Sequence, residues 1–247
     1  MKIDAGLTLV EVLVAMAILG IVLALITNWQ TQTLQLTTST SAQAQQLADL
    51  NDVTGYIGDR VRAAVRVRVA TSGLTVNTGT GNACSASSPC LAVVIPEGTA
   101  AGALKYVLYV YRMQARSVVS SDDKLDDTWA EDNVQVLREY RSADTASTPI
   151  NCVPGAGETF ETSVVSACAT MRNLDTQTSL TGFQPFLIAD YLTPSDALPG
   201  GVTAFSWLPA SRSVTVNVQS LRRVRGVSKM LPAASAYTLT VQGRNLP

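Results

Sequence analysis

Residues 7–27 form one apolar run of 21 residues that carries a single charged side chain, Glu11. At about 1.5 Å of rise per residue, a helix of this length just crosses a bilayer core of roughly 30 Å. The sequence therefore predicts a membrane-spanning helix. A carboxylate inside such a helix costs about 2.5–3.5 kcal/mol at the bilayer centre and less toward an end. We therefore interpret Glu11 as a functional residue that requires a partner charge.

A short leader, residues 1–6, carries Lys2 and ends in Gly6, and the apolar run then begins at Leu7 with Glu11 as its fifth residue. This arrangement resembles the N-terminus of type IV prepilins, which have a short charged leader, Gly, a hydrophobic residue and then Glu. The resemblance implies cleavage between Gly6 and Leu7 by a prepilin peptidase on the cytoplasmic side, and methylation of the new amine. Leu7 replaces the Phe that is frequent there, and the span lacks the proline usual in major pilins.

The same residues predict how such a subunit would pack. Cleavage before Leu7 creates a positive amine at the end of an apolar helix, and Glu11 of a neighbouring subunit is a charge that neutralises it. Ala17, Gly20 and Ala24 share one helix face, where small side chains allow close helix approach. The alternative is that they only reflect the composition of membrane helices.

Four segments follow from this interpretation: a leader at 1–6, a transmembrane helix at 7–27, an amphipathic continuation at 28–66 and an exported β-rich head at 67–247. A conventional secretory signal is disfavoured because its apolar core is shorter and carries no acid. A plain signal-anchor remains the alternative. Because positive charge precedes the span and none follows before Arg60, the N-terminus is expected on the cytoplasmic side of the inner membrane.

The four cysteines suit an exported head. Cys84 with Cys90, and Cys152 with Cys168, each enclose a short loop without metal-ligand spacing, so they are interpreted as disulfides. Three connectivities exist, of which the two local pairs are preferred, and free thiols are the alternative. The chain has no histidine, which excludes Ser-His and Cys-His nucleophile systems and histidine-containing zinc sites.

Beyond the membrane the helix is expected to continue, giving about 55–60 helical residues in all. Its weakest stretch is 37–41, where Thr and Ser have low helix propensity. An apolar stripe then predicts the face that lies on the head, and it consists of Leu47, Leu50, Val53, Ile57, Val61 and Ala64.

The remaining chain predicts strands, so the fold class is α+β, a long N-terminal helix packed on an antiparallel sheet, similar to minor pilins and J-like pseudopilins. The expected strands are 65–69, 91–95 stopped by Pro96, 104–113, 134–140, 186–189, 202–207, 213–219 with one wet face, and 237–241. Residues 104–113 and 134–140 are expected to pair. Residues 142–184 are interpreted as a surface insertion pinned by a disulfide, and 222–232 as a loop.

Two kinds of charged cluster could indicate binding of calcium or of DNA. The aspartates of 122–127 are spaced like calcium ligands, but the loop lacks the turn glycine and the terminal glutamate, which favours a solvated loop. Two groups of arginines could contact DNA phosphates. The first consists of Arg60, Arg62, Arg66 and Arg68, and the second of Arg222, Arg223 and Arg225. DNA is an alternative partner that is not favoured, because the overall charge is balanced.

The resemblance thus predicts a non-enzymatic, minor pilin-like subunit of a type IV pilus, serving twitching or DNA uptake, with a type II secretion pseudopilin as the alternative. Its expected partners are other pilins or pseudopilins, the prepilin peptidase and the inner membrane. No cofactor, metal or small-molecule substrate is expected. A hypothesis from another class, a signal-anchored exported enzyme or binding domain, would have to use carboxylates such as Glu158 and Glu161.

Overall fold

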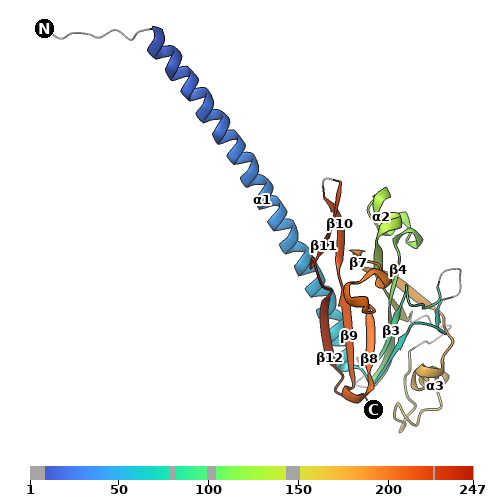
Figure 1. Cartoon of the computed structure of the whole chain (residues 1–247). Coiled ribbons are helices and arrows are strands. Elements are labelled where there is room, and N and C mark those ends of the chain that lie inside the picture. The colour runs from blue at the N-terminus through green and yellow to red at the C-terminus, as the bar shows by residue number, and fades with distance from the viewer. Residues whose placement is uncertain (1–8, 78–81, 99–103, 143–150, 225, 247) are drawn as a thin grey trace. The chain divides into compact units, whose positions relative to one another are not determined.

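A computed structural model describes residues 9–77, 82–98, 104–142, 151–224 and 226–246 (Figure 1). The chain divides into two compact units, Met1–Gln46 and Leu47–Pro247, which are described separately. Gly6 and Leu7 lie outside the described residues.

The described part of the first unit is helical throughout. Helix α1 (Leu9–Ala63) has 55 residues, and it continues without interruption through the Thr- and Ser-rich stretch that is weakest in propensity. Thr37 there donates its hydroxyl to the Thr33 carbonyl at 2.9 Å, and Thr40 donates to Leu36 at 2.8 Å. Such bonds satisfy the hydroxyl within the helix.

The second unit contains the end of α1 and all the described strands. The strands are β1 (Arg66–Ala70), β2 (Thr75–Val76), β3 (Cys90–Gly98), β4 (Leu104–Ala115), β5 (Gln135–Ser142), β6 (Ser179–Leu180), β7 (Phe183–Leu192), β8 (Phe205–Leu208), β9 (Ser213–Val218), β10 (Ser220–Val224), β11 (Val227–Leu231) and β12 (Tyr237–Gln242). The short helices are α2 (Thr128–Asn133), α3 (Ser166–Arg172), and the 3-10 turns η1 (Arg116–Val118), η2 (Ser121–Asp123), η3 (Leu174–Thr176), η4 (Ser195–Ala197), η5 (Pro199–Gly201) and η6 (Pro209–Ser211).

Three sheets organise this unit. A seven-stranded antiparallel sheet has the order β1-β3-β4-β5-β7-β10-β11, a three-stranded sheet has the order β12-β9-β8, and β2 pairs with β6. The predicted pairing of 104–113 with 134–140 is confirmed by the β4–β5 register, in which Tyr109 faces Arg141 and Met113 faces Leu137. The α+β fold class, a long N-terminal helix with an antiparallel sheet head, is confirmed.

Two hydrophobic cores lie on opposite faces of the seven-stranded sheet. Strand β3 alternates between them: Leu91 and Val93 belong to the first core, and Ala92 and Val94 to the second. The first core is covered by α1 and the three-stranded sheet, through side chains such as Ile57. Because β3 is buried on both faces, it is a continuous apolar run rather than an alternating one.

The end of α1 follows the predicted stripe with two corrections. Leu50, Val53, Ile57 and Val61 are buried, whereas Leu47 is 40% exposed. The helix also ends at Ala63 rather than at residue 66, because the Val65 amide already donates to the Val94 carbonyl of β3 at 2.8 Å.

The segment 142–184 is not a surface insertion over the part that the structure describes. Residues 151–183, here called the stapled cover, carry much of the second core. Their buried apolar side chains are Cys152, Phe160, Cys168, Met171, Leu174, Leu180 and Phe183. The Ser, Thr and Gly content conceals this role, since the apolar residues are widely spaced.

Three strand predictions also need correction. Strand β3 continues through Pro96. Like Val94, whose carbonyl accepts from the Val65 amide, Pro96 faces the β1 side of the strand, but no β1 residue lies opposite it. The amide hydrogen that proline lacks therefore costs no hydrogen bond of the sheet. Residues 222–232 are not a loop, since they contribute to the β10–β11 hairpin. Strand β9 has no wet face, because five of its six residues are buried beneath neighbouring elements.

Candidate assembly site

The N-terminal part of α1 is apolar and uncovered. Its most apolar 18-residue stretch has a mean hydropathy of 2.9, and none of that stretch is buried. Helix α1 is the one candidate membrane span among the described residues. Trp29, two residues past the predicted span, is 71% exposed. Tryptophan is enriched where a membrane helix meets water, so Trp29 is suited to the interface.

Glu11 lies in the first turn of α1 and is exposed there. An acid in the first turn also interacts favourably with the partial positive charge of the helix N-terminus. Ala17, Gly20 and Ala24 are exposed as well, and a Cβ added to Gly20 would meet nothing within 4 Å.

The continuous helix separates these residues into two faces. At about 100° per residue, Ala17, Gly20 and Ala24 fall within one narrow sector, and Glu11 lies about 120–180° away from them around the axis. The carboxylate and the small-residue face therefore point toward different neighbouring helices. This follows from the spacing of the residues along a continuous helix.

Between Glu11 and Asp49 the helix carries no Asp, Glu, Lys or Arg. In the polar part of this stretch several threonine hydroxyls donate hydrogen bonds to backbone carbonyls three or four residues earlier. The residues that do so are Thr27, Thr31, Thr33, Thr37, Thr38 and Thr40. The side of the helix is thus uncharged, and the hydroxyls of these threonines are satisfied within the helix.

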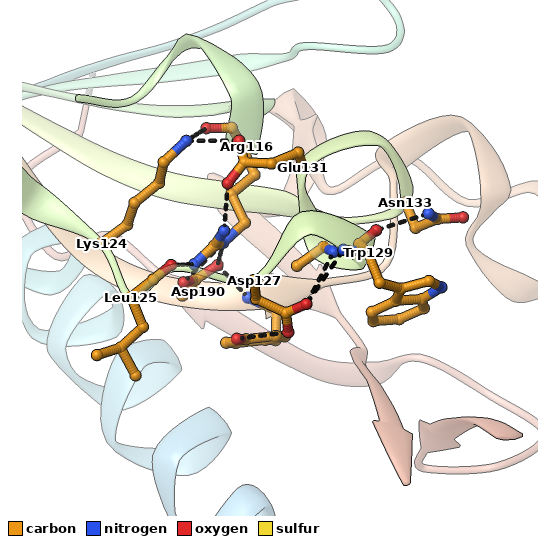
Figure 2. A network of polar contacts seen from close by, with 10 residues as sticks. Arg116, Lys124, Leu125, Asp127, Trp129, Glu131, Asn133 and Asp190 are labelled. Atoms are coloured by element: carbon orange, nitrogen blue, oxygen red, sulfur yellow. Dashed lines mark hydrogen bonds and ion pairs between the residues drawn. The ribbon is translucent and has the colours of Figure 1, made fainter. Parts of the chain in front are cut away.

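In the head, a buried arginine holds the loop between β4 and β5. Arg116 is fully buried, and its Nε donates to both carboxylate oxygens of Asp190 at 3.0 Å while Nη1 pairs with Glu131 at 2.5 Å (Figure 2). Burial lowers the pKa of Arg116, but the hydrogen bonds and charge of Asp190 outweigh it, so the pKa is raised. Lys124 joins the network through Glu131 at 2.5 Å.

Asp127, one of the aspartates in the calcium-like pattern, caps α2. One carboxylate oxygen accepts from the backbone amides of Trp129 at 3.2 Å and Ala130 at 3.4 Å, and the other accepts from the Tyr191 hydroxyl at 3.0 Å (Figure 2). Over the described residues, no group of three or more His, Cys, Asp or Glu side chains is placed to hold a metal ion.

The first arginine group is engaged inside the head. Arg60 lies over the Tyr109 ring at 4.3 Å and donates to the Tyr56 hydroxyl at 3.2 Å. Arg66 pairs with Glu161 at 2.8 Å, and Arg68 donates to the Leu174 carbonyl at 2.7 Å. Arg62 pairs with Asp59 at 2.6 Å. These contacts agree with the interpretation of the group as intrachain pairs.

The second arginine group lies on a strand rather than in a loop. Arg222 and Arg223 belong to β10, and Arg222 is 3.6 Å from Asp49. Arg225 lies outside the described residues.

The two carboxylates considered for acid–base chemistry have structural contacts. Glu158 accepts from the Gly155 amide at 3.1 Å, and hydrogen bonds from Ser163 and Gly155 lower the pKa of Glu158. A general acid at neutral pH needs a raised pKa instead. Glu161 is paired with Arg66.

Both disulfides join the local pairs. Cys84 bonds to Cys90 and Cys152 to Cys168, and all four cysteines belong to the second core. Within the described residues no cysteine is free.

Sequence reasoning missed the Arg116 network. A lone arginine after an apolar strand has no pattern that marks it as buried, and Asp190 is distant in sequence. Helix α2 was also missed, although Asp127 before Thr128 is a typical N-cap position.

The helix and the head together define a class of protein: a single-pass, membrane-anchored α+β protein whose anchor is the first part of its N-terminal helix. A family model described as the prokaryotic N-terminal methylation motif matches residues 1–27. The chain is therefore a type IV prepilin-like precursor, anchored in the inner membrane with an exported C-terminal domain, and the match does not distinguish pilin from pseudopilin. No curated protein and no solved structure matches the chain.

Proposed function

We propose that the chain is a non-enzymatic, minor pilin-like subunit of a type IV pilus, cleaved after Gly6 and methylated at Leu7. The observation that carries this proposal is the methylation motif over residues 1–27, with Glu11 inside the apolar helix. The motif implies processing by a prepilin peptidase and assembly with other pilins.

Assembly would use the two faces of the helix separately. Glu11 would pair with the N-terminal amine of one neighbour and so set the axial stagger, while Ala17, Gly20 and Ala24 would allow a second helix to approach closely. The uncharged surface of residues 12–48 supports this role, because helix packing there desolvates no formal charge.

A pseudopilin of type II secretion is the second candidate, supported by the same motif and by a head enlarged beyond a simple sheet through the stapled cover. Deleting the gene separates the two. Loss of twitching or DNA uptake supports the pilus, whereas loss of exported enzymes from the medium with normal pili supports the pseudopilus.

Mass spectrometry of the N-terminal peptide from the cell envelope tests the processing step. We expect a chain that begins at Leu7 and carries one added methyl group. A chain that begins at Met1, or that is cut after residue 27, would overturn the proposal. Replacing Gly6 with a bulky residue should block maturation, because the peptidase must accommodate that position.

The replacement Glu11→Ala tests assembly. We expect near-normal processing at Gly6 but strongly reduced recovery in sheared filaments, because the amine of the neighbouring subunit loses its counter-charge. Glu11→Asp is the matched control, since it keeps the charge and should retain part of the incorporation. Normal incorporation of Glu11→Ala would contradict the charge-pairing account.

A further inference from the structure

Charge is distributed unevenly along the head. After Asp196 the chain has six Lys and Arg residues and no Asp or Glu, whereas residues 121–132 contain six Asp and Glu residues and one Lys. The balanced net charge of −1 therefore conceals two local surfaces of opposite sign. Fields of this kind act on partners within about one Debye length, roughly 8–10 Å.

The positive surface is the basic hairpin, which consists of β10 and β11, residues 220–224 and 227–231. It joins the seven-stranded sheet through one residue pair, Ser220 with Leu192, and β11 is an edge of that sheet. Arg223 and Lys229 are exposed, and neither has an ion pair among the described residues. Apolar side chains lie beside them, with Val227 61% exposed and Met230 44% exposed.

The negative surface is the acidic loop, residues 121–132. Asp122, Asp126 and Asp132 are exposed and have no ion pair within the described part of the chain. Leu125 beside them is 76% exposed. The acidic loop therefore presents negative charges that no ion pair of the described head neutralises, with one exposed apolar side chain among them.

The acidic loop is held to the head by ion pairs and hydrogen bonds. The buried Arg116 pairs with Glu131 of the loop and with Asp190 of β7, and Asp127 caps α2 (Figure 2). A loop that is fixed before binding loses less conformational entropy when a partner docks. The network therefore stabilises the loop in one conformation that can be recognised.

The two surfaces lie at the same end of the head, and they are not paired with each other. Leu221 of β10 belongs to one buried hydrophobic cluster with Ala130 of α2 and with Val134. Figure 1 shows α2 and the β10–β11 hairpin at that end of the head. Over the described residues, no ion pair joins the hairpin to the loop; the hairpin pairs with α1 through Arg222 and Asp49. Each surface is thus available to another molecule.

We propose that the basic hairpin of one copy docks on the acidic loop of a second copy of this chain. Both halves of the contact exist on one head, and their charges and exposed apolar side chains are complementary. Such a contact joins different patches of the two copies, so each residue of the hairpin meets residues of the loop and not its own counterpart. The inference rests on the proposed function as a filament subunit and adds that copies lie next to one another.

Nucleic acid is a poorer occupant for the hairpin. Residues 220–231 contain no aromatic side chain on which a base could stack, and the acidic loop beside them repels phosphates.

Cysteine crosslinking of the purified full chain in detergent micelles tests the contact. Thr128→Cys and Ser228→Cys place one thiol in each surface without changing charge, and the native cysteines of the described chain are already bonded. A mixture of the two variants should give at least about tenfold more crosslinked dimer than either variant alone, with a yield that falls in high salt. Equal yields would overturn the proposal.

Charge reversal sharpens the test. Arg223→Glu with Lys229→Glu on the Ser228→Cys copy should abolish the crosslink to the Thr128→Cys copy. Adding Asp126→Lys with Asp132→Lys to the Thr128→Cys copy should restore it. The matched control is Asp175→Lys with Arg244→Glu on the Ser228→Cys copy. It alters exposed charges elsewhere on the head and should leave the yield of crosslinked dimer unchanged.

The outcomes separate this inference from the proposed function. A chain that matures at Leu7 and enters filaments, but whose crosslink ignores charge reversal, refutes the contact and leaves the function intact. A chain that never matures refutes the function. If the hairpin reversal instead abolishes binding to a DNA duplex while no crosslink forms, the surface belongs to nucleic acid and the proposed contact is wrong.

Discussion

The two faces of the seven-stranded sheet are buried by covers of different construction. On the first face, α1 and the three-stranded sheet bring regular elements with continuous apolar stripes, including Ile57 and Val216. On the second, the regular elements of the stapled cover are α3, η3 and β6, together with Phe183, the first residue of β7. All four cysteines lie in that second core and none in the first.

The difference shows where covalent bonds are needed. A helix or sheet satisfies its own backbone, so the first cover needs no covalent bond and is held by apolar burial with a few polar contacts such as Arg60 with Glu97. The stapled cover has long irregular stretches whose ordering costs about 1–2 kcal/mol per residue, and a disulfide reduces that cost by constraining the unfolded chain. Each cover should therefore fail for a different reason.

The largest effect is expected from Ile57→Ala on the first cover. Ile57 is fully buried in the first core, so its loss should lower the free energy of unfolding by about 2–5 kcal/mol. Thermal unfolding of the full chain in detergent measures this. Ile57→Val, which keeps most of the burial, should cost about 0.5–1.5 kcal/mol. Equal costs would show that the first cover does not rely on packing.

Next comes removal of the staple with Cys152→Ser and Cys168→Ser. This disulfide closes 16 residues, so we expect a loss of about 3 kcal/mol. Hydrogen exchange should rise within the stapled cover before it rises in the end of α1. The shorter Cys84–Cys90 link, with a separation of 6, should cost less when both cysteines are replaced by Ser. Uniform acceleration across both covers would contradict the comparison.

A smaller effect separates two glycines of the same helix. A Cβ at Gly58 would lie 3.1 Å from Leu239 and 3.2 Å from Val241 of β12, whereas one at Gly55 meets nothing within 4 Å. Ala instead of Gly inside a helix gains about 1 kcal/mol. Gly55→Ala should therefore stabilise the head, and Gly58→Ala should gain clearly less because β12 must shift. Identical melting temperatures for the two variants would argue against this close contact.

The smallest effect at neutral pH concerns Tyr109 in the first core. Burial, together with the hydrogen bond that its hydroxyl donates to Glu97, raises the pKa of Tyr109 from 10 to about 12. The folded state then holds this proton more tightly than the unfolded state, so stability should be unaffected below pH 10 and fall as pH rises toward 12. Unfolding midpoints across that range measure the fall, which should be shallower in Tyr109→Phe.

The helix, the fold class and the principal strand pairing follow from the sequence because they depend on local periodicity. The stripe through Leu50, Val53, Ile57 and Val61 repeats at helical spacing, and 104–113 is rich in β-branched and aromatic residues. The two local disulfides are the preferred connectivity because the head is expected to be exported and the separations are short.

The rest depends on contacts distant in sequence. Pro96 stays within β3 because β1 begins at Arg66, opposite Val94, and does not reach Pro96. Strand β11 pairs with β10 although four of its five residues are exposed. The stapled cover is buried by scattered residues such as Phe160 and Met171, which carry no period. Arg116 is identified only when Asp190 and Glu131 are seen around it.

The uncharged length of α1 also bears on how the chain moves. Residues 12–48 correspond to about 55 Å of helix without a formal charge. In the proposed assembly this helix moves along the bilayer normal out of the membrane, and residues 12–48 bring no ionised side chain into hydrocarbon. Over this length the work of extraction is set by the exchange of lipid contacts for contacts with neighbouring helices. Glu11 follows as the one charge that crosses the hydrocarbon, and pairing with a neighbour's amine would lower the cost of that step.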